Sequence, residues 1–170
     1  MARRKRQRGQ SLVEVSIFIP IVLVLLLGIG DLARVFATMI AVESAAREAA
    51  DWGAYRPGNW DTIVPQYPTT VAQMERRACT AARDLPDYLG APDGSTCTNP
   101  TFICSFGAES ATGSCSPPGC DPLTQTCWVK VSLTYDFELI VPTGLLALPS
   151  TLTFERSSTF AIGKDPGGTP

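Results

Sequence analysis

The strongest constraint on this chain is an apolar run, residues 15–30, that contains no charged side chain. As an α-helix rising about 1.5 Å per residue, this run would span roughly 24 Å, and residues 12–30 would span about 28 Å. The second length matches the hydrocarbon core of a bilayer, about 30 Å. The sequence therefore predicts one membrane-spanning helix. Glu14 would lie at the edge of the hydrocarbon, where burying a carboxylate costs about 2.5–3.5 kcal/mol unless it has a partner.

Basic residues crowd into the first eight positions, ahead of the apolar run. They are Arg3, Arg4, Lys5, Arg6 and Arg8. Basic residues beside a membrane helix stay in the cytoplasm, which predicts that everything after the run is exported. A cleaved secretory signal is the rival interpretation. It fits less well because Glu14 interrupts its pattern and because a long alanine-rich stretch, rather than a small-residue cleavage site, follows the run.

The helix is expected to continue from Ser11 to Ala54, since residues 32–54 are mainly good helix formers. Pro20 predicts a kink or local loosening, because it cannot donate to the carbonyl of Ser16. Small residues recur at every fourth position beyond the membrane, and such a ridge lets another helix approach closely. The ridge consists of Ala33, Ala37, Ala41, Ala45, Ala49 and Gly53.

An apolar stripe at helical spacing runs along the same stretch. It consists of Val35, Met39, Val42, Ala46 and Ala49. Two interpretations stay open for this part of the helix. Its small and apolar side chains could pack on the protein's own domain, or they could pack against helices of other subunits.

Six cysteines, all placed after the apolar run, predict disulfides, because an even count in a loop-rich exported region is typical of them. They are Cys79, Cys97, Cys104, Cys115, Cys120 and Cys127. A zinc site is the alternative, and Cys115 with Cys120 forms one close pair. With no second close pair and no histidine in the chain, we expect no metal. For one pairing, we expect Cys79 to join Cys127.

The exported part is expected to contain a second helix, capped by Thr70 and stopped by Pro86. It would begin at Thr69 or Thr70 and run to about Leu85. Its expected core-facing residues are Val71, Met74, Ala78 and either Ala81 or Ala82. Its arginines, Arg76, Arg77 and Arg83, would form an outward, solvated face.

Strand signals follow the second helix. Residues 86–126 are rich in turn formers and predict loops with a short strand at 101–106. Residues 127–141 alternate between apolar and polar side chains, which predicts a half-buried strand. Residues 151–162 would pair with it as an antiparallel hairpin across the connection 142–149. The predicted fold class is α+β: a long membrane-spanning helix, then a second helix packed on a small antiparallel sheet with disulfide-held loops.

We find no catalytic constellation in the sequence. The chain has no histidine, the usual general base, and Asp136 and Glu138 would share an exposed strand face. Without the five leader residues, nine basic side chains face 16 acidic ones, a net charge of −7 that argues against nucleic-acid binding. We therefore expect no enzyme activity and no cofactor. A hydrolase that uses carboxylates alone is the remaining enzymatic alternative.

The stretch of residues 8–50 combines several landmarks: Arg8-Gly9 before the helix, Gln-Ser-Leu-Val-Glu at 10–14, Pro20, Gly-x-x-Asp at 28–31 and Ala-Ala-Arg-Glu-Ala at 45–49. Together they closely resemble the N-terminal module of TadE-like proteins, which are minor pilins or pseudopilins of Tad (Flp-type) tight-adherence pili. The cysteine-rich middle of the chain is not a general feature of that family.

The resemblance implies that a prepilin peptidase cuts after Gly9 and leaves Gln10 as the new N-terminus. Glu14 is then the fifth mature residue, where pilins carry their glutamate. In a staggered bundle, the new amine of one subunit would meet Glu14 of its neighbour, so that each charge offsets the burial of the other. The expected assembly residues are Glu14, Pro20, Ala33, Ala37, Ala41 and Ala45.

The expected organisation is pilin-like. It comprises a cleaved leader (1–9), a helix (10–54), an exported domain (55–163) with a cysteine-rich loop region (86–127), and a disordered tail (164–170). The protein would sit in the inner or cell membrane with its N-terminus cytoplasmic, and would assemble with other pilin subunits and the pilus machinery to initiate, prime or cap a filament. The alternative is a monomeric, membrane-anchored, exported binding module that never enters a filament.

Overall fold

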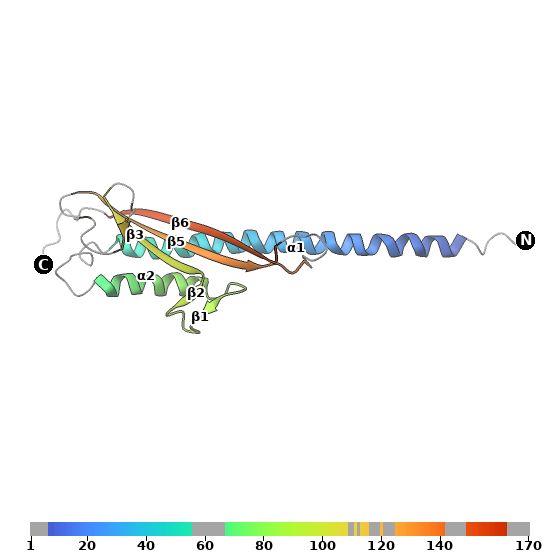
Figure 1. Ribbon diagram of the computed structural model, residues 1–170, viewed down its shortest axis with the longest axis horizontal. Coiled ribbons are helices and arrows are strands. Elements are labelled where there is room, and N and C mark those ends of the chain that lie inside the picture. The colour runs from blue at the N-terminus through green and yellow to red at the C-terminus, as the bar shows by residue number, and fades with distance from the viewer. Residues whose placement is uncertain are drawn as a thin grey trace, which may run out of the picture.

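The computed structural model describes residues 7–55, 67–108, 111, 113–115, 120, 125–141 and 149–162. Its dominant element is helix α1, Gln7–Ala54, whose 48 residues span about 72 Å at the usual rise. Figure 1 shows the strands and the second helix lying along one half of α1, while the half nearer the N-terminus stands clear of them. One long helix thus serves both as a projecting apolar rod and as a support for the domain.

Helix α1 runs without interruption through Pro20 (Figure 1). The helix begins at Gln7, four residues before the expected start at Ser11, and it ends at Ala54 as expected. The leader is therefore helical in its last residues, while residues 1–6 lie outside the described part of the chain. The tail expected to be disordered, 164–170, also lies outside it.

The second helix, α2, spans Tyr67–Ala82, so both of its predicted ends are wrong. Thr70 is not the cap but a buried residue within the helix. The helix tolerates Pro68 because a proline in the first turn removes no internal hydrogen bond. At the other end, tight turns replace the helical pattern before Pro86 is reached: the amide of Arg83 donates to the carbonyl of Thr80, and Leu85 donates to Ala82.

The larger sheet has four antiparallel strands in the order β4-β3-β5-β6. Its strands are β3 (Thr101–Gly107), β4 (Gly113–Ser114), β5 (Cys127–Glu138) and β6 (Thr151–Ile162). The predicted hairpin is confirmed: β5 and β6 pair along their full lengths, from Cys127 opposite Ile162 to Glu138 opposite Thr151. A second sheet pairs β1 (Leu89–Gly90) with β2 (Cys97–Asn99). The short strands β1, β2 and β4 lie in the region predicted as loops.

The core forms where α1 and α2 cover one face of the large sheet. The inward side chains of β5 are fully buried, which confirms the predicted alternation. They are Val129, Val131, Leu133, Tyr135 and Phe137. The apolar stripe of α1 packs against this layer, with Val35, Val42, Ala46 and Ala49 buried and Met39 at its border. From α2, the core receives Met74, Ala78 and Ala82, whereas Ala81 is exposed. The stripe therefore packs on the protein's own domain.

Asn99, at the end of β2, joins the small sheet to the large one. Its side-chain amide donates to the carbonyls of Asp87, at 2.6 Å, and Asp136, at 2.8 Å. Its carbonyl oxygen accepts from the backbone amide of Asp136 at 2.9 Å. A buried side chain that makes three such bonds holds the β1–β2 segment on β5, and it does so at the end of β5 nearest the projecting part of α1 (Figure 1).

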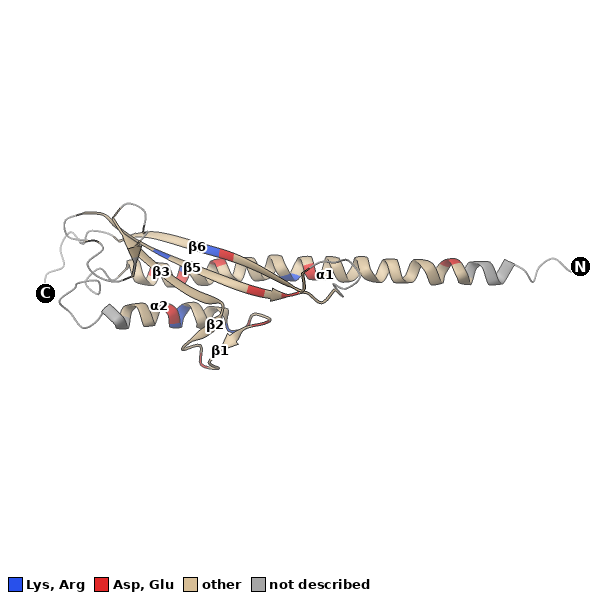
Figure 2. Cartoon of the chain, in the orientation of Figure 1, with Lys and Arg blue, Asp and Glu red and all other residues tan. Residues whose placement is uncertain are grey.

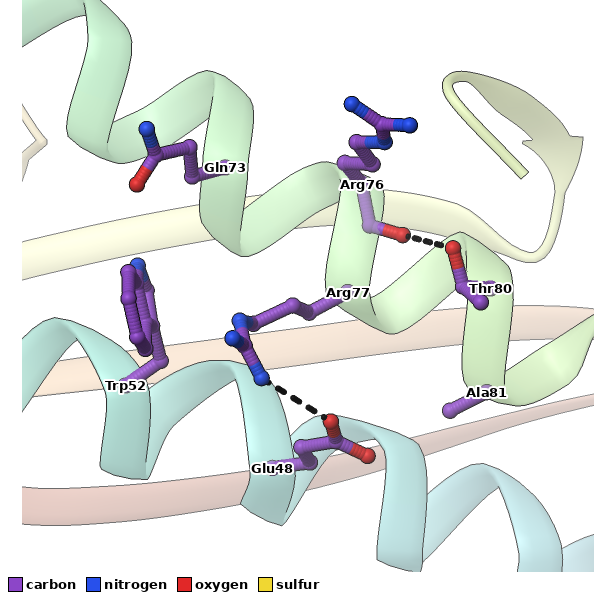
Figure 3. Close-up of a pocket in the computed structure, with 7 residues that line it drawn as sticks. All are labelled: Glu48, Trp52, Gln73, Arg76, Arg77, Thr80 and Ala81. Carbon is purple, nitrogen blue, oxygen red and sulfur yellow. Dashed lines mark hydrogen bonds and ion pairs between the residues drawn. The ribbon is translucent and has the colours of Figure 1, made fainter. Parts of the chain in front are cut away.

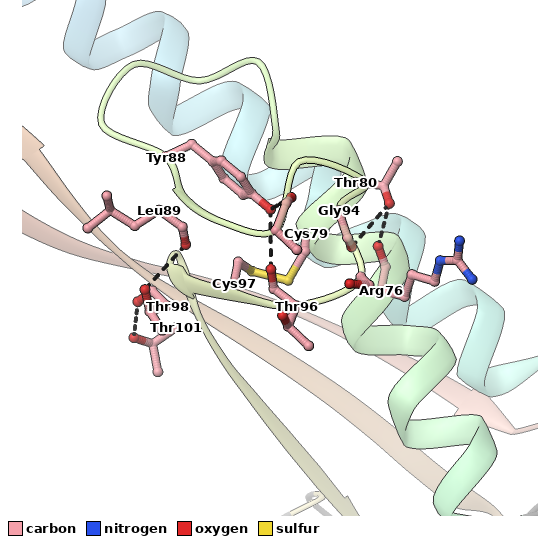
Figure 4. Close-up of a disulfide and its surroundings, with 12 residues drawn as sticks. Arg76, Cys79, Thr80, Tyr88, Leu89, Gly94, Thr96, Cys97, Thr98 and Thr101 are labelled. Carbon is pink, nitrogen blue, oxygen red and sulfur yellow. Dashed lines mark hydrogen bonds between the residues drawn. A yellow bond between two sulfur atoms is a disulfide. The ribbon is translucent and has the colours of Figure 1, made fainter.

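Disulfides are present as predicted, but the expected Cys79–Cys127 pair is wrong. The pairs are Cys79–Cys97, Cys104–Cys115 and Cys120–Cys127, so each bond closes a short segment of chain. Figure 4 shows the first pair joining α2 to β2. Beside it, Gly94 approaches Thr80 so closely that a Cβ would stand 2.8 Å from the Thr80 Cα, and its φ of +70° also requires glycine.

The buried hydroxyl of Tyr135 makes no hydrogen bond within the described chain. Burial, together with the nearby charge of Asp87, raises the pKa of Tyr135 to about 12, so the hydroxyl stays protonated. Its ring packs against Phe154, with centroids 5.6 Å apart. We expect Tyr135→Phe to keep this ring contact and to stabilise the domain by about 1 kcal/mol, because an unpaired buried hydroxyl costs free energy. Urea denaturation of the purified protein measures the change, and a loss of stability would contradict it.

Candidate assembly interface

The membrane segment, residues 12–30 of α1, makes no contact that buries it against the domain. Its side chains are exposed throughout, apart from the half-buried Val24. The segment is long and apolar enough to cross a bilayer, with a mean hydropathy of 2.8 in its most apolar window. In water such a surface would be strongly unfavourable. Lipid, other helices or both must therefore cover it.

Glu14 is the one acidic group on this segment. Figure 2 shows one isolated acidic band on the projecting half of α1, separated from the next charge by a long uncharged stretch, and Glu14 is the acid that the sequence places there. It borders a shallow hollow of about 530 Å³ whose other walls are apolar: Val15, Phe18, Ile19, Val22 and Leu23. Among the side chains that the structure describes, none forms an ion pair with Glu14. The structure thus presents a carboxylate on an apolar face of the described helix.

Gly9 and Gln10, the predicted processing residues, lie in the first turns of α1. Only their backbone is described, so the structure places the bond between them without showing its surroundings. Helix ends fray, and a terminal turn is the part of a helix that opens most readily.

The small-residue ridge of α1 is divided by the domain. Ala33 and Ala37 are exposed, Ala41 is half-buried, and Ala45, Ala49 and Gly53 are buried. Ala45 therefore packs against the protein's own domain and offers no surface to another helix. Only the part of the ridge nearer the membrane remains accessible.

An exposed apolar row continues the membrane segment along α1, and the sequence interpretation missed it. Leu32, Phe36 and Ile40 are 57%, 59% and 69% exposed. Their spacing of four residues, which places them on one side of a helix, was the available signal. Together with Ala33 and Ala37 they form what we call the α1 outer row. The exposed charges of Glu43 and Arg47 follow Ile40 and end it.

Asp31 ties α1 to the end of the β5–β6 hairpin, a role that sequence analysis also missed. It is 4% exposed. One carboxylate oxygen accepts from the backbone amides of Ile140 at 2.9 Å and Val141 at 2.8 Å, and the other accepts from Arg34 at 3.1 Å. Burial raises the pKa of Asp31, but these bonds outweigh it and hold the pKa below its ordinary value. The sequence signals were its place in the Gly-x-x-Asp landmark and its position as the first charge after the apolar run.

Arg34 extends this tether into the core. Its guanidinium stands 4.8 Å from the centre of the Phe137 ring while it pairs with Asp31. A cation over an aromatic face is attracted by the ring, and the contact is stronger where water is partly excluded. Arg34 thus links the tether to the buried face of β5.

A second hollow, of about 570 Å³, lies between α1 and α2 (Figure 3). There Arg77 pairs with Glu48 of α1 at 3.3 Å and stacks 4.0 Å above the ring of Trp52. The expectation that Arg77 is merely solvated is therefore wrong, whereas Arg76 points away from α1 as predicted (Figure 3). Gln73, Arg76, Thr80 and Ala81 complete the lining. Within the described residues, no group of three or more His, Cys, Asp or Glu side chains could hold a metal ion.

Comparison with known proteins supports the module at the N-terminus. Residues 9–51 match the family model described as TadE-like protein, which is about a quarter of the chain. The comparison with curated proteins gives no match, and neither does the comparison with solved structures. The suspected TadE-like resemblance is thus confirmed for the segment that forms most of α1.

Proposed function

We propose that this chain is a minor pilin or pseudopilin of a Tad-type pilus, and that it assembles through α1 to initiate, prime or cap the filament. The observation that carries this proposal is the projecting half of α1. It matches the TadE-like module, it is apolar and uncovered, and it holds Glu14 on an otherwise apolar face. Its partners would be the helices of other pilin subunits, the assembly machinery and the membrane.

The orientation that we propose places the N-terminus in the cytoplasm and the domain outside. The basic leader supports this topology. The three disulfides support it as well, because such bonds persist mainly in oxidising compartments. Processing by a prepilin peptidase after Gly9 would then remove the leader from the cytoplasmic side.

We expect Gly9→Leu to block this processing, because a bulky side chain would occupy the position just before the cut bond. Gln7→Leu, a change of similar size two residues earlier, is the matched control and should mature normally. The mass of the purified protein's N-terminal peptide distinguishes a chain that starts at Gln10 from one that retains its leader. A Gly9→Leu protein that still starts at Gln10 would contradict the proposed processing site.

The alternative function is that of a monomeric, membrane-anchored, exported binding module. The hollow between α1 and α2 favours it, because Trp52 and Arg77 offer aromatic and charged surface there. Recovery from native membranes separates the two functions. A filament subunit co-purifies with other pilins, whereas an independent module is recovered without them and keeps an intact leader.

A further inference from the structure

The end of the β5–β6 hairpin is held at one definite level along α1. The amides of Ile140 and Val141 both bond to Asp31, which directly follows the membrane segment 12–30. The amide of Leu139 bonds to the carbonyl of Ser150, which keeps the two sides of the hairpin together there. We call Leu139, Ile140 and Val141 the hairpin tip; they follow β5 and are the last described residues before the connection to β6. Its position relative to the apolar segment is thus set by hydrogen bonds.

The hairpin tip consists of three apolar side chains that are partly or largely exposed. Ile140 is 60% exposed, and Leu139 and Val141 are half-buried. On α1, Ile29 and Leu32 lie within two residues of Asp31 in sequence and are 64% and 57% exposed. Apolar surface on two separate elements therefore appears at the same level of the molecule, next to the end of the membrane segment.

We propose that the hairpin tip rests in the interfacial layer of the bilayer and gives the exported domain a second contact with lipid. This inference rests on the proposed function only for the membrane anchoring of α1 and the exported position of the domain. If residues 12–30 fill about 28 Å of hydrocarbon, Asp31 and the tip stand at its boundary, since the core is about 30 Å thick. Apolar side chains gain free energy by entering that layer.

The charges near the tip indicate which lipid surface it meets. The nearest exposed charges on the hairpin, Asp136 and Glu138, are acidic, and Asp87 accepts from the amide of Glu138 at 3.0 Å. Acidic groups repel anionic headgroups, so the contact is apolar and does not depend on anionic lipid. A zwitterionic bilayer is therefore the appropriate partner for a test.

The test places one labelled cysteine at a time in the full-length protein. All six native cysteines are paired, so an added cysteine supplies the only free thiol. A polarity-sensitive dye is attached at Ile140→Cys, at Leu25→Cys in the membrane segment, or at the exposed Thr159→Cys on β6. Thr159 pairs with Lys130, ten residues from Ile140, or about 33 Å away along the strand. Each protein is placed as one copy per phosphatidylcholine nanodisc.

We expect a quencher carried near the lipid headgroups to quench the Ile140 dye at least about threefold more strongly than the Thr159 dye, since an interfacial side chain lies only about 5–10 Å deep. Soluble iodide should show the reverse order. Adding Asp31→Asn should weaken the lipid quenching at Ile140, because the tether loses its charge and its pairing with Arg34.

The other outcomes overturn the inference in distinguishable ways. If the Ile140 dye behaves like the Thr159 dye while the Leu25 dye is shielded from iodide, the anchoring stands and the tip contact is refuted. If iodide quenches the Leu25 dye as strongly as the Thr159 dye, the proposed anchoring fails and the inference fails with it. If the Ile140 dye is shielded only in vesicles that hold many copies, the tip contacts another copy of the chain rather than lipid.

Discussion

Glu14→Ala should give a protein that is cleaved, membrane-inserted and disulfide-bonded, but that fails to join its partner pilins. In the proposed bundle, the amine of mature Gln10 on one subunit is neutralised by Glu14 of the next. Removing the carboxylate leaves that amine buried and unpaired, at a cost of about 3–5 kcal/mol when burial is complete. Association should therefore weaken by about 10²- to 4×10³-fold. Recovery of the other pilus subunits with the affinity-tagged protein is the measurement.

The position of Glu14 makes this test specific. Insertion should not suffer, because the change makes the membrane segment more apolar, and the domain packs on a part of α1 that begins beyond it. Glu43→Ala is the matched control, since Glu43 is an exposed acid on the same helix outside the membrane segment. If Glu14 only lies among the lipid headgroups and pairs with no other subunit, the opposite result is expected: partner pilins should co-purify with both variants as they do with the wild type.

Asp31→Ala should release the hairpin tip from α1. It removes the only acceptor that the structure shows for two backbone amides, those of Ile140 and Val141. At about 1–3 kcal/mol for each donor left unpaired, the local cost is about 2–4 kcal/mol after allowing for partial access of water. Amide hydrogen exchange should accelerate at these two residues by about 30- to 700-fold, because 1.4 kcal/mol corresponds to a factor of ten.

Asp31→Asn provides the matched comparison. The amide oxygen of asparagine can still accept from both backbone amides, but the side chain loses its charge and its pairing with Arg34. We expect a smaller acceleration of exchange than with alanine, and unchanged exchange in the centre of β5 for both variants. Unaltered protection of Ile140 and Val141 in Asp31→Ala would show that the carboxylate does not hold the tip.

The repeating patterns of apolar residues in the sequence correctly predicted the buried faces of strand β5 and helix α1. The alternation in β5 predicts its buried face reliably, because shifting the strand by one residue would turn every buried side chain outward. The apolar pattern therefore also specifies the pairing register. The apolar stripe of α1 likewise identified the buried face, with Val42 and Ala46 at its centre. What periodicity could not decide was whether that face packs within the chain or between chains, because both arrangements bury the same side chains.

The missed features depend on partners that are distant in sequence or that are backbone groups. Asp31 bonds to amides 109 and 110 residues away, and backbone amides leave no trace in a sequence. Arg77 lies against Trp52 and Glu48 only because α2 packs beside α1. The pairing of Cys79 with Cys97 depends on the small β1–β2 sheet, whose strands are two and three residues long and too short to recognise as strands.

The arrangement of the disulfides has a mechanical consequence. Helix α1 contains no cysteine, so each covalent cross-link lies within the domain and none ties the domain to α1. In the proposed filament of α1 helices, tension would pass along the helices, while the domain is attached to them by non-covalent contacts and by the main chain that continues past Ala54. Under a pull, the domain would detach from the side of its helix as an internally cross-linked unit that stays joined by the main chain, and the packed helices would remain intact.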